Sequence, residues 1–341
     1  MRGMNRRQFG MVVGSAGMAL AAGSRRSLAQ AEPLKIRVGW VVIPASTAPL
    51  VLEKKDVLAH YGKSYVLEAT RFEGTPPVIT ALAGGQVDVG PLAFSSFALA
   101  IENAHLDDLR VICDEVQDGV TGHGTNEFMV LNDGPVKTVT DLKGKVLATN
   151  AMGSAVDIAM RAMLRKNGLE ANKDYTIVEA PFPAMRAMLA ERKADLVSAV
   201  PPFSLDPQLR DMARTLFTQK DAFGTTQLTL WAARTGFLQK NRAAMVDFME
   251  DVLRAIRWYV DPANHAQAVA IVARLMKAPP ERFDWAFTNR DQYRDPNGIP
   301  NLDALRNNLQ KQKEVGFLNG DVDVAKYSDL TIVQEAANRL K

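Results

Sequence analysis

Two stretches of similar design, Thr80-Ala-Leu-Ala-Gly-Gly-Gln-Val-Asp-Val89 and Arg186-Ala-Met-Leu-Ala-Glu-Arg-Lys-Ala-Asp-Leu196, lie far apart in the chain. Each runs from the end of a helical pattern through a polar turn to an aspartate and an apolar strand pattern. Helix-turn-strand joints are common, so a chance similarity is the alternative explanation. The repeat favours two similar α/β lobes, and a cleft between such lobes is a natural site for a small ligand.

Outward from these stretches, short β-rich apolar runs alternate with helical patterns, which is typical of α/β units on a parallel sheet. The predicted strands are 35–40, 65–71, 87–90, 109–113, 127–131, 145–149, 175–178, 195–200, 215–217 and 228–233. Amphipathic patterns in the last third predict helices at 241–260, 265–277, 280–289 and 301–316. The expected fold class is α/β, with two similar lobes of mainly parallel sheets flanked by helices and a ligand cleft between them. We expect the first lobe to comprise 34–126 plus 230–341 and the second lobe 127–229.

The segment 1–31 has the three parts of a secretory leader. A basic start that includes Arg6 and Arg7 precedes an apolar run without acidic residues, and Ser27-Leu-Ala-Gln-Ala31 is a small-residue tract that a signal peptidase can cut. Asn5-Arg-Arg-Gln-Phe9 has the paired arginines of a twin-arginine signal. A membrane anchor is the alternative, but it needs roughly 20 strongly apolar residues. We therefore expect a twin-arginine signal peptide and a periplasmic protein.

The charge balance of the chain depends on this leader. The chain holds 41 lysines and arginines against 38 aspartates and glutamates, a formal net charge of +3. Five of the arginines and none of the acidic residues lie in 1–31, so the remainder has 36 basic against 38 acidic residues. This nearly neutral remainder gives no reason to expect nucleic acid or an anionic membrane as a partner. The single cysteine, Cys113, excludes an intramolecular disulfide and follows an apolar run that predicts a buried strand.

Three strand-to-helix junctions place small hydroxylated residues at predicted helix starts. Such starts carry unpaired backbone N–H groups and the positive end of the helix dipole, which favour an anion or a polar acceptor. The junctions are Glu73-Gly-Thr-Pro-Pro77 with Thr75 as the N-cap, Ser95-Ser96 after Phe94, and Asn150-Ala-Met-Gly-Ser154 with a capping-box pattern from Ser154 to Asp157. Plain helix capping explains any one junction, whereas three after successive strands favour a binding site.

Neighbouring segments add further candidates. The segment 43–49 supplies the hydroxyls of Ser46 and Thr47 before a predicted helix. Phe203 follows a strand of the second lobe, where stacking on a ligand and core packing are equal alternatives. The loop 119–125 contains His123, a candidate ligand contact, but its glycine spacing is not G-x-G-x-x-G and a strand follows it. We interpret this loop as the segment before a crossing between the lobes.

No catalytic or metal-binding arrangement stands out. The four histidines, at positions 60, 105, 123 and 265, lack metal-ligand spacing, and no nucleophile has an evident base beside it. We expect a monomeric protein that is not an enzyme and that carries no cofactor or metal.

Taken together, these motifs resemble the NitT/TauT-type substrate-binding proteins of ABC importers, the group of nitrate, taurine and alkanesulfonate receptors. The landmarks are Ile36-Arg-Val-Gly-Trp40, Ala48-Pro-Leu50, Phe72-Glu-Gly-Thr-Pro-Pro77, Gly85-Gln-Val-Asp-Val-Gly90, Asp141-Leu-Lys-Gly-Lys-Val146, Gly153-Ser-Ala155 and Pro202-Phe203. The resemblance runs from about Lys35 to the C-terminus and implies a type II periplasmic-binding fold. It also implies a receptor that closes two lobes over a small solute and presents the closed form to a membrane permease with its ATPase.

The resemblance implies ligand contacts at specific positions of this chain. They are Ser46, Thr47, Thr75, Ser95, Ser96, Gly153, Ser154 and Ala155. Two positions depart from the family's pattern. Pro201 stands where an acidic residue commonly precedes Pro-Phe, and Phe94 stands where many relatives have a small or polar residue.

The solute expected from these residues is a small organic anion, either a sulfonate or an aromatic or organic carboxylate. Phe94, Met152 and Phe203 would contact its organic tail. The junctions contain no arginine, which disfavours bare nitrate unless Arg71 or Arg186 reaches the cleft. A receptor for a pyrimidine-type thiamine precursor or a flavin is one alternative, and it needs aromatic side chains that face one another. The other is an enzyme on the same fold, such as a desulfinase, which needs a nucleophile in the cleft.

Overall fold

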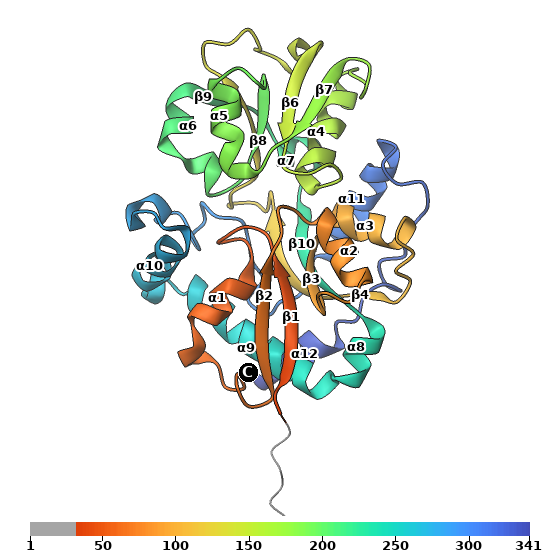
Figure 1. Ribbon diagram of the computed structural model, residues 1–341, viewed down its shortest axis with the longest axis vertical. Helices are drawn as coiled ribbons and strands as arrows, with labels where there is room; N and C mark the ends of the chain where they lie inside the picture. Colours follow the sequence, from red (N-terminus) through yellow and green to blue (C-terminus); the bar gives the residue numbers. More distant parts are fainter. Residues whose placement is uncertain (1–31) are drawn as a thin grey trace, which may run out of the picture. The chain divides into compact units, whose positions relative to one another are not determined.

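The computed structural model describes residues 32–341, and the expected leader, 1–31, lies outside them. Pro33–Lys341 forms one compact unit with two five-stranded sheets (Figure 1). The strands are β1 (Leu34–Trp40), β2 (Tyr65–Arg71), β3 (Val89–Ala93), β4 (Leu109–Asp118), β5 (Glu127–Leu131), β6 (Lys145–Thr149), β7 (Tyr175–Glu179), β8 (Leu196–Ala199), β9 (Ala213–Thr218) and β10 (Thr226–Arg234). The α-helices are α1 (Thr47–Glu53), α2 (Pro76–Ala83), α3 (Phe94–Glu102), α4 (Ala155–Lys166), α5 (Met185–Ala190), α6 (Pro207–Met212), α7 (Gln219–Phe223), α8 (Thr235–Lys240), α9 (Arg242–Val260), α10 (His265–Met276), α11 (Leu302–Glu314) and α12 (Thr331–Arg339).

Both sheets have the same topology. The first has the strand order β2-β1-β3-β10-β4 and the second β7-β6-β8-β5-β9. In each sheet the first three strands are parallel, and the last two pair antiparallel with their neighbours. The two-lobed α/β fold class is confirmed, but the sheets are mixed rather than mainly parallel. The reason is that β5 and β10 each enter their sheet from the other one and run against the parallel strands.

The two stretches that opened the sequence analysis are equivalent in space. Asp88 donates its N–H to the carbonyl of Arg37 at 2.8 Å and accepts the N–H of Arg37 at 2.9 Å. Asp195 makes the same pair of bonds with Val146, at 2.7 and 3.0 Å. Each aspartate thus joins the start of a strand to its parallel neighbour, and the repeat is structural.

The strand predictions agree with the structure, and one helix prediction is wrong. All ten predicted strands are present, although β4 continues past Cys113 to Asp118. The segment 280–289 forms only a short 3-10 helix, Pro280–Phe283. Phe287 adopts a left-handed φ of 60°, and its N–H donates to Asp291 Oδ2 at 2.9 Å, so the chain turns instead of continuing a helix.

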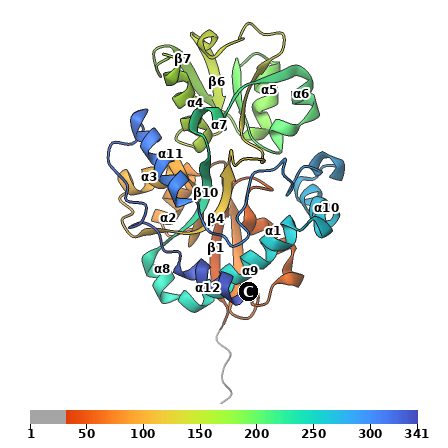
Figure 2. The same cartoon turned by 180° about the vertical axis from the view of Figure 1, so that it is seen from behind.

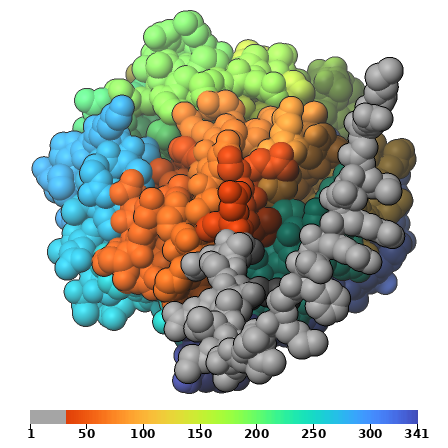
Figure 3. Space-filling model, turned by 60° about the horizontal axis from the view of Figure 1, so that its bottom comes forward, coloured from red at the N-terminus to blue at the C-terminus, as the bar shows by residue number. Residues whose placement is uncertain are grey.

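Helices cover both faces of the first sheet. On one face α9 and α12 pack against β1, β4 and β10 around Phe248 and Trp231 (Figure 2). On the other face α2, α3 and α11 form an apolar cluster that continues into α4 of the second sheet. Figure 3 shows α1 and α10, which are far apart in the sequence, side by side at the surface. No helix within residues 32–341 combines the length and apolar character needed to cross a lipid bilayer.

The chain passes between the sheets twice within the described residues, after β4 and before β10. We propose that lobe 1 is the first sheet with its helices, 34–126 plus the C-terminal part, and that lobe 2 begins at residue 127. The sheet membership of β10 supports a return to lobe 1 at Thr226, slightly before the expected residue 230. The two lobes are used in this sense below.

Candidate functional site

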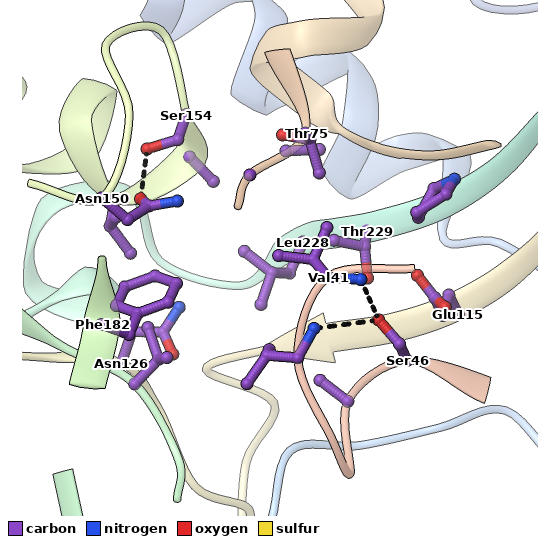
Figure 4. A pocket seen from close by; sticks show the side chains of 18 of the residues that line it. Val41, Ser46, Thr75, Glu115, Asn126, Asn150, Ser154, Phe182, Leu228 and Thr229 are labelled. Atoms are coloured by element: carbon purple, nitrogen blue, oxygen red, sulfur yellow. Dashed lines mark hydrogen bonds between the residues drawn. The ribbon is translucent and has the colours of Figure 1, made fainter. Parts of the chain in front are cut away.

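A cavity lies between the lobes, near the ends of several strands in both sheets (Figure 4). Ligands of open α/β sheets commonly bind outside the carboxyl ends of strands. The lining residues are Val41, Val42, Ala45, Ser46, Gly74, Thr75, Pro91, Ala93, Glu115, Leu228, Thr229 and Gln292 of lobe 1, Asn126 at the crossing, and Asn150, Ser154, Ala155, Val156, Phe182, Val200 and Pro201 of lobe 2. In Figure 4 the side chains of Asn150, Ser154 and Phe182 lie opposite those of Ser46, Thr75 and Glu115.

The hydroxyl groups of lobe 1 are held by local hydrogen bonds. Ser46 Oγ accepts the N–H groups of Val41 and Val42 at 3.0 and 3.3 Å, which shapes the turn after β1. Both bonds use the oxygen as acceptor, so the O–H of Ser46 remains to donate. Thr75 occupies the N-cap position of α2 but does not cap it, because its hydroxyl bonds Ser96 Oγ at 2.6 Å.

Glu115 is a buried carboxylate in the wall of the cavity, with 2% of its surface exposed. In the pairing of β4 with β10, Leu230 is opposite Asp114 and Thr229 is opposite Val116, so Glu115 is the extra residue of a β-bulge. Bulges next to functional sites re-aim a side chain. Burial raises the pKa of Glu115 to about 7, although hydrogen bonds to Oε1 from Thr47 N–H at 3.1 Å and Trp231 Nε1 at 3.0 Å oppose the rise.

Lobe 2 presents the N-terminus of α4. Ser154 is the N-cap, since its Oγ accepts the N–H of Asp157 at 3.3 Å, and it donates to Asn150 Oδ1 at 2.9 Å. Asp157 is buried, accepts Gly153 N–H at 2.8 Å and pairs with Arg161 Nε at 2.8 Å. The first backbone N–H groups of a helix have no intrahelical partner, and Ala155 and Val156 of this first turn line the cavity.

A second cavity adjoins the first, because Val41, Val42 and Phe182 line both. Trp40 of lobe 1 lines this second cavity together with Phe182 and Phe203 of lobe 2, whose rings stack with centroids 6.1 Å apart. Arg71 also lines it, and this side chain is paired with Glu73 at 3.4 Å. Arg186 lines neither cavity and pairs with Asp206 at 3.3 Å.

Direct hydrogen bonds join the lobes on one side of the cavity. Ser95 Oγ donates to the carbonyl of Gly153 at 2.8 Å, and Asn150 Nδ2 donates to the carbonyl of Glu73 at 3.2 Å. The structure therefore holds the lobes in contact beside the cavity.

The structure brings some of the predicted ligand-binding residues to the cavity. Those that line it are Ser46, Thr75, Ser154, Ala155 and Pro201. Three others make hydrogen bonds between the lobes or within lobe 1. Ser95 and Gly153 bond to each other across the cleft, and Ser96 holds Thr75.

The remaining predicted residues lie elsewhere. Thr47 is buried and contributes only its N–H, to Glu115. Phe94 lies in the core against Phe223, with centroids 5.3 Å apart, because it begins α3 on the face turned to the interior. The last residues are outside the first cavity: Met152 is 52% exposed, Phe203 lines the second cavity, and His123 lines two others and packs edge-on against Tyr293.

Sequence reasoning missed several residues of the lining. Glu115 and Thr229 come from strand interiors, and Gln292 comes from the irregular segment after α10. Gln292 Nε2 donates to Asp118 Oδ2 at 2.8 Å, and burial raises the pKa of Asp118 to about 6. One signal was present: the acidic residues of Asp114-Glu-Val-Gln-Asp118 interrupt an otherwise apolar strand.

The lining offers binding groups and one carboxylate. Within the described part of the cavity wall there is no cysteine, histidine, lysine or arginine. Cys113 is buried in β4, and its burial raises the pKa of the thiol. Across residues 32–341 no group of three or more His, Cys, Asp or Glu side chains is placed to hold a metal ion.

Fold and cavity together define a two-lobed protein with the fold of periplasmic binding proteins, and the resemblance to NitT/TauT-type proteins is confirmed. The chain belongs to the NMT1-like family, whose model matches residues 29–273.

Individual relatives are more distant. The nitrate/nitrite binding protein NrtA of Synechococcus elongatus is 25% identical over 190 residues, which cover 52% of this chain but only 43% of that protein. The alkanesulfonate-binding protein SsuA of Xanthomonas axonopodis pv. citri, solved bound to MOPS, has a TM-score of 0.69 at 19% identity, covering 88% of this chain and all of that one, 100%. A desulfurization enzyme, DSZB, has a TM-score of 0.62 at 14% identity, covering 90% of this chain and 100% of that one. These structural likenesses establish the shared fold.

Proposed function

We propose that this protein is the periplasmic substrate-binding component of an ABC importer, exported by its twin-arginine signal, which captures a small organic solute and delivers it to a membrane permease. The observation that carries the proposal is the division of the cavity lining between two lobes, with Ser46 and Thr75 on one side and Asn150 and Ser154 on the other. A ligand that touches both lobes binds the closed form better than the open one, and this difference drives closure.

The organic anion expected from the sequence remains the proposed class of solute. Its donors would be the Ser46 hydroxyl and the first N–H groups of α4, because no lysine or arginine belongs to the described lining. Hydroxyl and N–H donors without a cation favour a weakly hydrated organic acid with an apolar body, which Val41, Leu228 and Phe182 would contact.

A receptor for a pyrimidine or flavin-type solute is the second candidate. It is supported by Trp40 of lobe 1, which lines the adjoining cavity together with Phe182 and Phe203 of lobe 2. An enzyme has less support, since Cys113 is buried and His123 lies in other cavities. We therefore propose a binding protein that is not an enzyme.

Two measurements test this proposal. Mass spectrometry of the protein recovered from the periplasm gives the mature N-terminus and any retained solute, and a thermal-shift screen with millimolar sulfonates, carboxylates and pyrimidines gives the class. A solute at 100 times its Kd stabilises the folded protein by about 2.7 kcal/mol, so binding raises Tm. The proposal fails if no solute is retained and no compound raises Tm.

A further inference from the structure

Glu115 is the one ionisable side chain in the lining that residues 32–341 provide for the cavity between the lobes. An anion in this cavity would therefore lie near a carboxylate and would have no lysine or arginine in the described lining to balance it. A buried carboxylate without a counter-charge is itself costly, because it has lost its water. A positively charged donor on the solute would offset this cost, since the described lining contains no lysine or arginine.

The hydrogen bonds of Glu115 leave room for such a donor. The N–H of Thr47 and Nε1 of Trp231 both reach Oε1, which leaves Oε2 for a group in the cavity. The hydroxyl of Thr229, which also lines the cavity, faces Glu115 and lowers the pKa of this carboxylate. The backbone bulge at Glu115 gives this carboxylate a direction that regular pairing of β4 would not.

The positive charge that acts on Glu115 belongs to Arg294, whose two terminal amino groups bond other residues. Arg294 is buried outside the lining and pairs with Asp291 Oδ2 at 2.9 Å. Its second amino group donates to the carbonyl of Pro44 at 3.0 Å. Arg294 therefore lowers the pKa of Glu115 from a distance but does not occupy the cavity side of the carboxylate.

We infer that Glu115 recognises an N–H group of the solute, so that the solute carries an amine, an amidine or an amino-substituted ring. The inference rests on the proposed receptor function and narrows its solute: any anionic group lies toward the α4 side, and the nitrogen lies toward β4. A charge-assisted hydrogen bond from such a nitrogen to the carboxylate is stronger than one between neutral groups.

The test compares two compounds of one shape and opposite charge, benzamidine and benzoate, by isothermal titration calorimetry on the full protein. We expect the wild type to bind benzamidine more tightly than benzoate. Glu115→Gln keeps an oxygen for Thr47 and Trp231 and removes the charge. We expect this variant to bind benzamidine at least tenfold more weakly than the wild type does, while its affinity for benzoate is unchanged or higher.

Asp114→Asn is the matched control, because Asp114 is buried on the same strand but does not line the cavity. Its carboxylate accepts bonds from Gln227 and from the N–H of Asp295, at 2.6 and 2.9 Å. We expect Asp114→Asn to leave the preference for benzamidine unchanged. A loss of binding in both variants would assign the effect to the strand and overturn the inference.

The pH dependence of binding provides a second readout. The groups facing Glu115 are the N–H of Thr47 from α1, Trp231 and Thr229 from β10, and Arg294 from the segment after α10, and Asp114 is its neighbour on β4. None of the groups on the other elements changes its charge near neutrality, but burial raises the pKa of Asp114 to about 7 as well, so the profile is also measured on Asp114→Asn. Benzamidine needs the carboxylate, so its affinity should rise up to tenfold per pH unit toward pH 7 and level off above it. A protonated Glu115 that donated to benzoate would give the opposite slope.

The outcomes separate this inference from the receptor function. The inference is overturned if benzamidine does not bind the wild type, if benzoate binds as tightly, or if Glu115→Gln retains benzamidine. If a retained or screened solute still binds in those cases, the receptor function stands. If no solute binds at all, both fail.

Discussion

Lobe 1 brings a buried carboxylate, Glu115, to the cavity, whereas lobe 2 brings the N-terminus of α4, whose own carboxylate, Asp157, is turned toward Gly153 and Arg161. Both lobes share one topology, and the aspartates at the strand starts, Asp88 and Asp195, make matching hydrogen bonds. The two walls of the cavity nevertheless differ in charge. Topology therefore sets where the walls lie, and a few substituted side chains set what they bind.

In lobe 2 the charges near the cavity are balanced within the lobe. Burial raises the pKa of Asp157, but the charge and hydrogen bond of Arg161 and the N–H of Gly153 oppose the rise. In lobe 1 the acidic residues of β4 have only partial compensation, so burial raises the pKa of both Asp114 and Glu115 to about 7. The buried carboxylate of lobe 2 is thus paired within its own lobe, whereas the buried carboxylate of lobe 1 in the cavity wall is only partly compensated.

The largest loss of stability should follow from breaking the ion pair between Asp157 and Arg161 in lobe 2. Asp157→Ala leaves the largely buried side chain of Arg161, 12% exposed, without its partner and removes the acceptor for Gly153 N–H. Removing one member of a buried ion pair costs about 3–5 kcal/mol, and we expect that loss in the free energy of unfolding measured with urea. Asp133→Ala breaks the exposed pair with Arg192 and should change stability by less than about 0.5 kcal/mol. Equal effects of the two variants would contradict this account.

The second effect concerns Glu115, the partly compensated carboxylate of lobe 1, and has a defined pH window. The pKa of Glu115 is about 7 in the folded protein against 4.5 for an ordinary glutamate, so the folded state binds more protons between these values. Its contribution to stability is therefore present below pH 4.5 and is lost as pH rises to 7, by about 3 kcal/mol from the shift. Glu115→Gln should be more stable than the wild type at pH 8, with a gain that disappears toward pH 4.5.

Chemical denaturation at several pH values measures this gain. Glu68→Gln, on the exposed side of β2, is the control and should show no comparable dependence. A Glu115→Gln variant that is less stable than the wild type at pH 8 would mean that Glu115 is compensated within the protein and is not held for a solute.

The asymmetry of the walls also explains what the sequence could and could not reveal. Strand runs such as Tyr65–Arg71 and Lys145–Thr149 were found because local β-propensity and the fold agree there. Junction reasoning found Ser46, Thr75 and Ser154, because helix starts have a local signature.

The lobe 1 wall had no such signature. Glu115 is exposed to the cavity by a bulge that depends on its pairing with β10, a strand more than a hundred residues later in the chain. Phe94 shows the converse error: it sits at a helix start, as the junction rule requires, but tertiary packing against Phe223 turns it into the core. Whether a junction residue faces ligand or core is decided by the other layers, which a single sequence does not place.

A smaller effect tests how the lobes move relative to each other. Gly224 lies in the crossing before β10 with φ 72° and ψ −149°, a conformation that is essentially limited to glycine. Gly224→Ala should cost about 2 kcal/mol of stability and, in addition, weaken solute binding, because the strain falls on the segment that must adjust during closure. Gly62→Ala, at a surface turn of lobe 1 with φ 76°, should lower stability alone. If Gly224→Ala binds the solute as tightly as the wild type does, this crossing takes no part in the closing motion.

The smallest effect should come from the bond that joins the two walls directly. Ser95→Ala removes the hydrogen bond to the carbonyl of Gly153, worth about 1 kcal/mol in net terms, and this bond exists only when the lobes are in contact. The solute affinity should therefore fall about fivefold, and small-angle X-ray scattering should show a larger average radius without solute. Ser96→Ala removes the neighbouring bond to Thr75 within lobe 1 and should lower stability while the average radius stays the same. If Ser95→Ala instead binds the solute more tightly, Ser95 competes with the solute for lobe 2. That result would contradict the proposal that the bond from Ser95 to Gly153 stabilises the closed form.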